Sequence, residues 1–176
     1  MPYGDLEAMR VQRFETLDDI AAARPTIEER EEYEQPVREG MVMFAGVDYE
    51  AILRAAEAES DEIVWDGGNN DLPFYRLDLM FTVVDPLRPG HECGWSPGEV
   101  NLRLADVVVV NKIDSASPDA IGVVLANVGR LAPDAIVVQA ASPVVLSDGP
   151  PLAGSRVLVV EDGPTITHGG MPFGAR

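Results

Sequence analysis

The stretch "ADVVVVNKID" (residues 105–114) is an apolar run of strand length that ends in a polar tetrapeptide. Its four consecutive valines favour a β-strand, because β-branched side chains pack well on a pleated surface. Similar Val- and Ile-rich runs recur along the chain, separated by predicted helices and loops. Near-continuous apolar strands of this kind are typical of a parallel sheet that is covered on both faces. We therefore predict an α/β fold with a mostly parallel sheet and helices on both faces.

Around this stretch, the sequence predicts a series of strands that end in polar residues. These strands lie within residues 62–68, 77–86, 106–111, 135–143 and 155–164, and they end at Asp66, Asp85, Asn111, near Ser142 and at Asp162. Two shorter strand candidates, residues 10–14 and 41–46, precede them. In open parallel sheets, ligands bind beyond the carboxyl ends of the strands. We therefore expect a ligand site at the edge where these polar residues gather.

Helices are predicted between the strands from capping residues and apolar spacing. The predicted helices lie within residues 16–23, 27–40, 48–59, 97–105 and 117–133. Thr16, Asp48 and Ser117 are expected N-caps, since their side chains accept hydrogen bonds from the first helical turn. Pro36 is expected to interrupt the second of these helices.

The tetrapeptide Asn111-Lys112-Ile113-Asp114 matches the Asn-Lys-x-Asp sequence that reads guanine in GTP-binding proteins. The Asp114 carboxylate can accept from both N1–H and the 2-amino group of guanine, whereas adenine would leave it unpaired. A buried polar group without a partner costs about 1–3 kcal/mol. We expect the Lys112 stem to cover the base plane. Asn111 would face the O6/N7 edge or tie the loop to its neighbours. Ser142 follows the next strand, where GTPases support guanine O6 with a backbone N–H. The alternative is a chance tetrapeptide in which Asp114 is a turn residue.

The segment "IVWDGGNND" (63–71) resembles a Walker B element, an apolar strand that ends in a metal-binding Asp. Asp66 would bind Mg²⁺, which bridges nucleotide phosphates. Gly67 and Gly68 would allow the backbone to approach the γ-phosphate. Asn69, Asn70 and Asp71 would orient a nucleophile or a second substrate. Asn69 stands where the Asp-x-x-Gly motif of GTPases requires Gly. The alternative is a tight turn, which also favours Asp, Gly and Asn.

Two further loops carry candidate functional residues. In "VVDPLRPGHE" (83–92), Arg88 is a candidate phosphate ligand and His91 a candidate general base or phosphate donor. The alternative is a structural loop with a surface His. In "VVEDGPTITHGGMPFGA" (159–175), Gly169-Gly170 would cradle an anion, against the alternative of a mobile loop.

Composition restricts the partners. The 176 residues carry a net charge of −17, with 30 acidic and 13 basic side chains, and such a surface repels nucleic acid and anionic membranes. An acidic protein that handles phosphates needs Mg²⁺ or backbone N–H groups.

The single Cys93 excludes an internal disulfide and fits a reducing cytosol, so we expect a cytoplasmic protein. Lys112 is the chain's only lysine. The oligomeric state stays open.

Together, several motifs resemble one protein family. "MPYGDLEAMRVQRFETLDDI", "WDGGNND", "VVDPLRPGHE", "NKID" and "VLVVEDGPTITHGGMPFGA" look like the predicted GTPases related to archaeal cyclic 2,3-diphosphoglycerate synthetase. The resemblance implies a P-loop NTPase fold, similar to a G domain, in a much longer protein whose phosphate loop lies upstream. Residues 1–176 would then be a central fragment, a partial nucleotide-binding domain, with about 155–176 beginning a following segment.

The activity that the resemblance implies is ATP-driven closure of 2,3-diphosphoglycerate into its cyclic anhydride. In such a protein Asp66 would bind Mg²⁺, and Asp5 would be a second Mg²⁺ ligand or a switch residue. The base-reading motif favours GTP and the named activity favours ATP, so both nucleotides stay open. The second substrate would be 2,3-diphosphoglycerate or another phosphorylated small molecule. The alternatives are a GTPase of other substrate and a non-catalytic fragment that binds a nucleotide or a partner. We expect the isolated chain to be inactive.

Overall fold

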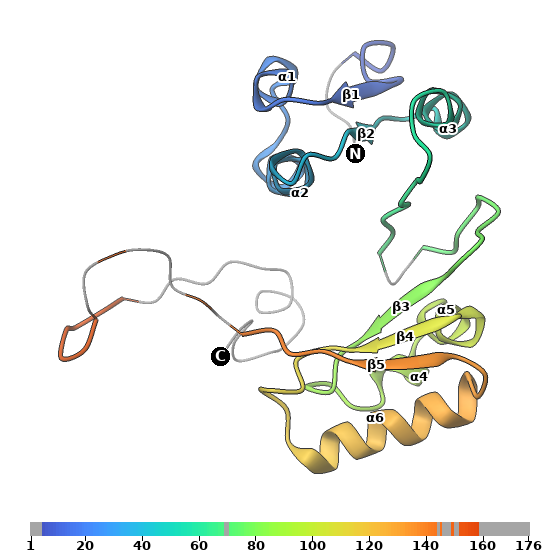
Figure 1. Cartoon of the computed structure of the whole chain (residues 1–176), viewed down its shortest axis with the longest axis vertical. Helices are drawn as coiled ribbons and strands as arrows, with labels where there is room; N and C mark the ends of the chain where they lie inside the picture. The colour runs from blue at the N-terminus through green and yellow to red at the C-terminus, as the bar shows by residue number, and fades with distance from the viewer. Residues whose placement is uncertain (1–4, 69–70, 144, 146–148, 150–151, 159–176) are drawn as a thin grey trace. The chain divides into compact units, whose positions relative to one another are not determined.

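The computed structural model describes residues 5–68, 71–143, 145, 149 and 152–158. The chain divides into two compact units, Met1–Trp65 and Asp66–Arg176. The first unit holds elements β1 to α3, and the second holds β3 to β5 (Figure 1). None of the described helices combines the length and apolar character needed to span a bilayer.

The first unit combines a two-stranded sheet with three helices. Its elements are β1 (Gln12–Phe14), α1 (Leu17–Ala23), α2 (Ile27–Arg38), β2 (Met43–Ala45) and α3 (Tyr49–Glu57). Strands β1 and β2 pair antiparallel, with Arg13 opposite Phe44. Both strands and all three helices agree with the predicted positions. Pro36 lies inside α2 without dividing it, two residues before the helix ends.

Local capping explains where these helices begin. Thr16 and Asp19 form a capping box at α1, in which each side chain bonds the backbone N–H of the other residue. The Asp48 side chain accepts a 3.0 Å bond from the Ala51 N–H at the start of α3. The predicted caps at Thr16 and Asp48 are therefore confirmed.

The first unit has its own small core. Phe14 of β1, Ile20 of α1, and Tyr33 and Val37 of α2 are buried together. The rings of Phe14 and Tyr33 stack with their centroids 5.1 Å apart. This cluster holds both helices against the two-stranded sheet.

The second unit is built on a parallel sheet. Its elements are β3 (Phe81–Val84), α4 (His91–Gly94), α5 (Gly98–Leu104), β4 (Val107–Val110), α6 (Pro118–Leu131) and β5 (Ile136–Gln139). The strand order is β3-β4-β5, and both pairs are parallel. The Ser117 side chain caps α6 by accepting from the Ala120 N–H, as predicted. The predicted α/β class and parallel sheet are confirmed, while a P-loop arrangement stays a prediction.

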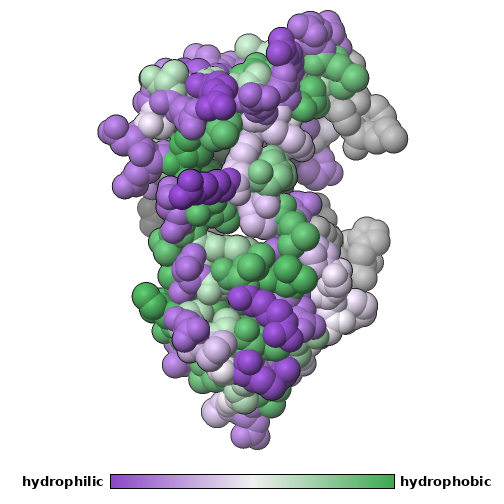
Figure 2. Space-filling view, turned by 90° about the vertical axis from the view of Figure 1, so that its right-hand side faces the viewer, coloured by the Kyte–Doolittle hydropathy of each residue, from purple (hydrophilic) through white to green (hydrophobic). Residues whose placement is uncertain are grey.

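Helices cover one face of this sheet. Val84, Val108 and Val110 are buried against side chains of α5 and α6, including Leu102 and Val124. On the opposite face, the residues of β3 and β5 are exposed. Hydrophobic surface of the second unit is open to solvent in the space-filling view (Figure 2). The second covered face that the sequence predicts is not seen within the described residues of this unit.

Two predicted strands differ from the structure. Residues 62–68 contain no strand, and Val64 is exposed. An apolar run becomes a strand only when a neighbouring strand satisfies its backbone, and no described strand pairs with this segment. Residues 155–158 also lack a strand, and the rest of that prediction, with the 159–175 motif, lies outside the described residues.

Candidate functional site

The loops that follow β3, β4 and β5 emerge at one edge of the parallel sheet. Val84, Val110 and Gln139 are the last paired residues of the three strands. The ladder continues one bond further, from the Asn111 N–H to the Val84 carbonyl and from the Ala140 N–H to the Val110 carbonyl. The loops after the three strands therefore start side by side at this edge, and the sheet brings the predicted motifs of these three strands together.

Lys112 connects the first two of these loops. Its Nζ donates to Oδ2 of Asp85 at 3.1 Å, and the two side chains are 27% and 24% exposed. The backbone of Lys112 has a φ of 55°, in the left-handed region that favours glycine. Residues in strained backbone conformations cluster at functional sites, and they also end helices, as Arg24 does at α1 with a φ of 52°. The strained backbone thus places the only lysine of the chain against a carboxylate of the neighbouring loop.

Asp114 connects the second and third loops. Its Oδ1 accepts from the Ser142 backbone N–H at 3.0 Å, and the Ile113 N–H donates to the Ala140 carbonyl at 3.2 Å. The Ser142 N–H, predicted to support a guanine oxygen, is directed at Asp114 in this structure. Asp114 is exposed, and an ionised carboxylate has about four acceptor positions. The group therefore retains acceptor capacity for a ligand.

Arg88 and His91 lie on the loop that begins at Asp85. The Asp85 Oδ1 accepts from the Leu87 N–H, and the Arg88 N–H donates to the Asp85 carbonyl. His91 begins the one-turn helix α4, which the sequence did not predict, and its ring contacts Trp95 edge-on. This compact turn keeps both predicted residues in the segment adjoining the Lys112–Asp85 pair.

Asp66, Gly67 and Gly68 stand in a loop and not at a strand end. The Asp71 N–H donates to the Gly68 carbonyl at 3.0 Å. Asn69 lies outside the described residues. The roles predicted for this loop in binding Mg²⁺ and phosphate therefore stay predictions. Among the described residues, no group of three or more His, Cys, Asp or Glu side chains is arranged to hold a metal ion.

Asn101 is a site-adjacent residue that the sequence analysis missed. It is only 7% exposed, the one buried polar residue among those described, and its Nδ2 donates to the Asp71 carbonyl at 2.9 Å. Its own carbonyl accepts from the Thr82 hydroxyl on β3. Asn101 thereby connects Asp71 to strand β3. The sequence offered one signal for this role, since Asn101 is a polar residue between Val100 and Leu102 in a predicted short helix.

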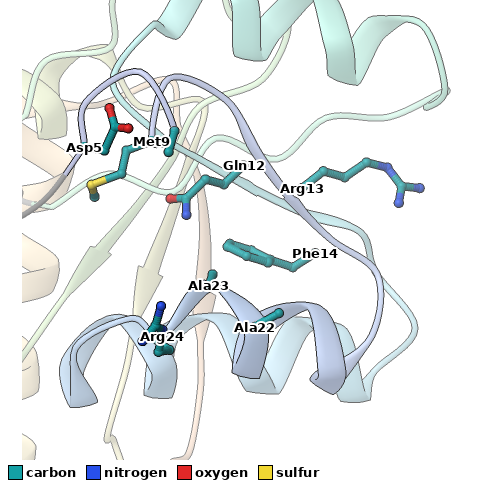
Figure 3. A pocket seen from close by; sticks show the side chains of 9 residues that line it. Asp5, Met9, Gln12, Arg13, Phe14, Ala22, Ala23 and Arg24 are labelled. Atoms are coloured by element: carbon teal, nitrogen blue, oxygen red, sulfur yellow. The ribbon is translucent and has the colours of Figure 1, made fainter.

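Asp5, the other predicted metal ligand, belongs to the first unit. Its Oδ1 accepts from the Glu7 N–H at 3.0 Å. Asp5 also lines a pocket of about 750 Å³ with Gln12, Phe14 and the end of α1. Phe14 and Arg24 contribute to its wall, while the Arg13 guanidinium points away from it (Figure 3). The role predicted for Asp5, as a second Mg²⁺ ligand or a switch residue, stays a prediction.

Comparison with known proteins finds one close relative for this region. The chain is 57% identical over 175 residues to a protein named Arginine synthetase ArcE from Thermococcus kodakarensis (strain ATCC BAA-918 / JCM 12380 / KOD1). The match covers 99% of this chain and 39% of the relative, so the chain spans about two fifths of the relative's length. No protein-family model matches the chain, and no solved structure matches it. The relative's name agrees with the synthetase part of the predicted resemblance.

Proposed function

We propose that this chain supplies the base-binding part of the nucleotide site in an NTP-dependent synthetase. One observation carries the proposal: the Asn-Lys-x-Asp loop is joined to both neighbouring strand-end loops, through Lys112–Asp85 and Asp114–Ser142. Parallel sheets bind ligands at this edge. The 57% identity to a synthetase across 99% of the chain supports the same class of activity.

In this proposal, each residue of the loop has a distinct role. Asp114 accepts from the N–H groups of the base, and its bond from Ser142 orients the carboxylate. Asp85 holds Lys112, and the Lys112 stem lies against the base. Guanine presents two adjacent N–H donors to the carboxylate, and adenine does not, so this role of Asp114 favours GTP. The synthetase resemblance favours ATP, and the binding experiment below decides between them.

The remaining steps of such a synthetase need Mg²⁺ and a phosphate-binding group. Asp66 is our candidate Mg²⁺ ligand, because a carboxylate oxygen suits this hard cation. Gly67 and Gly68 would allow a phosphate to approach the backbone. Mg²⁺ would neutralise the nucleotide phosphates, which an acidic chain of net charge −17 would otherwise repel.

The name of the relative points to arginine as the product of that relative. We extend that product to the protein that contains this chain, and retain closure of 2,3-diphosphoglycerate as the alternative implied by the motifs. A chimera of the relative in which this chain replaces the matching region separates the two. Arginine should inhibit its NTP turnover as a product, whereas inhibition by the cyclic diphosphoglycerate alone would favour the alternative.

Base binding is tested on the 176-residue chain by isothermal titration with Mg·GTP and Mg·ATP. Asp114→Ala should weaken binding of the preferred nucleotide roughly tenfold or more, since a lost charged hydrogen-bond partner costs about 1.5–3 kcal/mol. The matched control is Asp134→Ala, which removes an exposed carboxylate just before β5, at the opposite end of the strand from Ser142.

The control should leave both affinities unchanged. Binding of neither nucleotide, or equal affinities for Asp114→Ala and the unmodified chain, would contradict the proposal. We expect no useful NTP hydrolysis by the chain in the same titrations.

A further inference from the structure

One face of the parallel sheet is entirely apolar and carries no helix within the described residues of the second unit. Side chains alternate between the two faces of a strand, so the register places six residues on this face. We call them the open face: Phe81 and Val83 of β3, Val107 and Val109 of β4, and Ile136 and Val138 of β5.

The two outer strands of the open face are strongly exposed to solvent. Phe81, Val83 and Ile136 are 60%, 64% and 66% exposed, and Val138 is 43% exposed, whereas in the central strand Val107 is 7% exposed and Val109 is partly buried. Single exposed apolar residues are ordinary, whereas a contiguous apolar patch marks a surface that another structure covers. The six residues are contiguous, because they occupy two successive rows of the ladder.

The opposite face shows what such a sheet requires. There, Val108 and Val110 of β4 are fully buried beneath α5 and α6 and Val84 of β3 is 4% exposed, while Val137 of β5 is 43% exposed. Parallel sheets of Val- and Ile-rich strands occur almost only with both faces covered by helices.

The dimensions of the open face fit one helix. Four residues at about 3.3 Å each make a face roughly 13 Å long, and three strands span about 10 Å between the outer two. A helix is about 10 Å in diameter, so one amphipathic helix of about two to three turns matches this face.

We infer that the open face binds an amphipathic helix supplied by the part of a longer synthetase polypeptide that lies outside the region matching this chain. The relative carries such additional polypeptide, since the match spans 99% of this chain but only 39% of the relative. A second copy of the chain is a poorer occupant, because each copy carries a net charge of −17. The inference concerns folding and does not depend on which nucleotide is bound.

Cysteine accessibility tests this inference in the chimera defined above. In a Cys93→Ser background, Val83→Cys and Val138→Cys report on the open face. Val123→Cys on α6 is the matched control, since Val123 is 48% exposed on the helical side. Labelling by a small thiol reagent should be at least tenfold slower in the chimera than in the 176-residue chain at positions 83 and 138. At position 123 the rate should be unchanged.

A second measurement uses threonine, which keeps the β-branched shape of valine and adds a hydroxyl. Val83→Thr should lower the melting temperature of the chimera by a few degrees and leave that of the 176-residue chain nearly unchanged. Val108→Thr should lower both, because Val108 is buried in the second unit itself.

Three results would overturn the inference. Equal labelling rates in chimera and chain would show that nothing in the longer polypeptide covers the face. Slow labelling in the 176-residue chain that recovers on dilution would identify a second copy as the occupant. Slow labelling of the monomeric chain at every concentration would show that the face is already covered. Nucleotide titration of the same samples keeps the failure of this inference distinct from failure of the proposed function.

Discussion

Replacing Lys112 with Met and Asp85 with Asn, singly and together, should reveal a coupling free energy of about 1–2 kcal/mol between the two side chains. At the 3.1 Å separation of Nζ and Oδ2, the direct attraction is about 5 kcal/mol for an effective dielectric constant near 20. Desolvation and lost side-chain entropy offset most of it. Exposed pairs give about 0.2–1 kcal/mol, and this pair is about three-quarters buried, so we expect a value above that range.

The backbone at Lys112 allows a second, independent variant. A side chain in the left-handed region costs about 1 kcal/mol, which glycine avoids. Lys112→Gly should therefore be less destabilising than Lys112→Met by about that amount, although both variants lose the ion pair. Nucleotide binding should weaken in both, because both lose the Lys112 stem.

Urea unfolding followed by Trp95 fluorescence, in a Trp65→Phe background, reports on the second unit. The matched control is the exposed pair of Arg103 and Glu99 within α5, for which we expect coupling of no more than about 0.5 kcal/mol. Free-energy changes at Lys112 and Asp85 that add within about 0.3 kcal/mol would refute the reasoning. So would a coupling equal to that of the control pair.

Three further predictions concern stability. Val108→Ala should lower the free energy of unfolding of the second unit by about 2 kcal/mol, whereas Val83→Ala should change it by less than about 0.5 kcal/mol in this chain; urea titrations compare them. Gly46→Ala should destabilise the first unit by more than about 1 kcal/mol in circular-dichroism melts, because the new Cβ would lie 2.6 Å from the Arg10 carbonyl oxygen at a φ of 146°. The pKa of Asp48 is held below its usual value by a backbone N–H of α3 and by the Arg10 guanidinium. Its stabilisation is therefore present above the unfolded pKa, near 4, and is lost as pH falls through the lower folded pKa. Asp48→Asn should flatten this acid limb in urea titrations between pH 2 and 6, and an unchanged limb would contradict the assignment.

Local sequence signals predicted the helices well. Thr16, Asp48 and Ser117 each accept from a backbone N–H in the first turn of the helix that follows. Such bonds depend on residues three positions apart, and a single sequence shows them directly. The valine-rich strands β3, β4 and β5 were predicted for a similar reason, because their composition and flanking turns are local features.

Features that depend on distant partners were not predicted. Residues 62–68 have strand composition but no described partner, so the prediction of a strand there was wrong. The apolar character of a strand likewise does not say whether each face is covered. Only the structure therefore revealed that the open face carries no helix among the described residues of the second unit.

The candidate site shows the same division. The rule that parallel strands end at one edge predicted that the loops after Val84, Val110 and Gln139 would meet. Which side chains pair within that edge is a matter of tertiary geometry. The contact of Lys112 with Asp85, and the bond from Asn101 to Asp71, could not be deduced from the sequence.

The single lysine has a practical consequence for experiments on this chain. A protease that cleaves only after lysine finds one peptide bond in all 176 residues, the bond that follows Lys112. That bond separates β4 from α6, so a single cut divides the second unit within its sheet-and-helix core. The rate of this cut in the native protein would measure how often the loop opens, and a bound ligand that orders the loop would slow it.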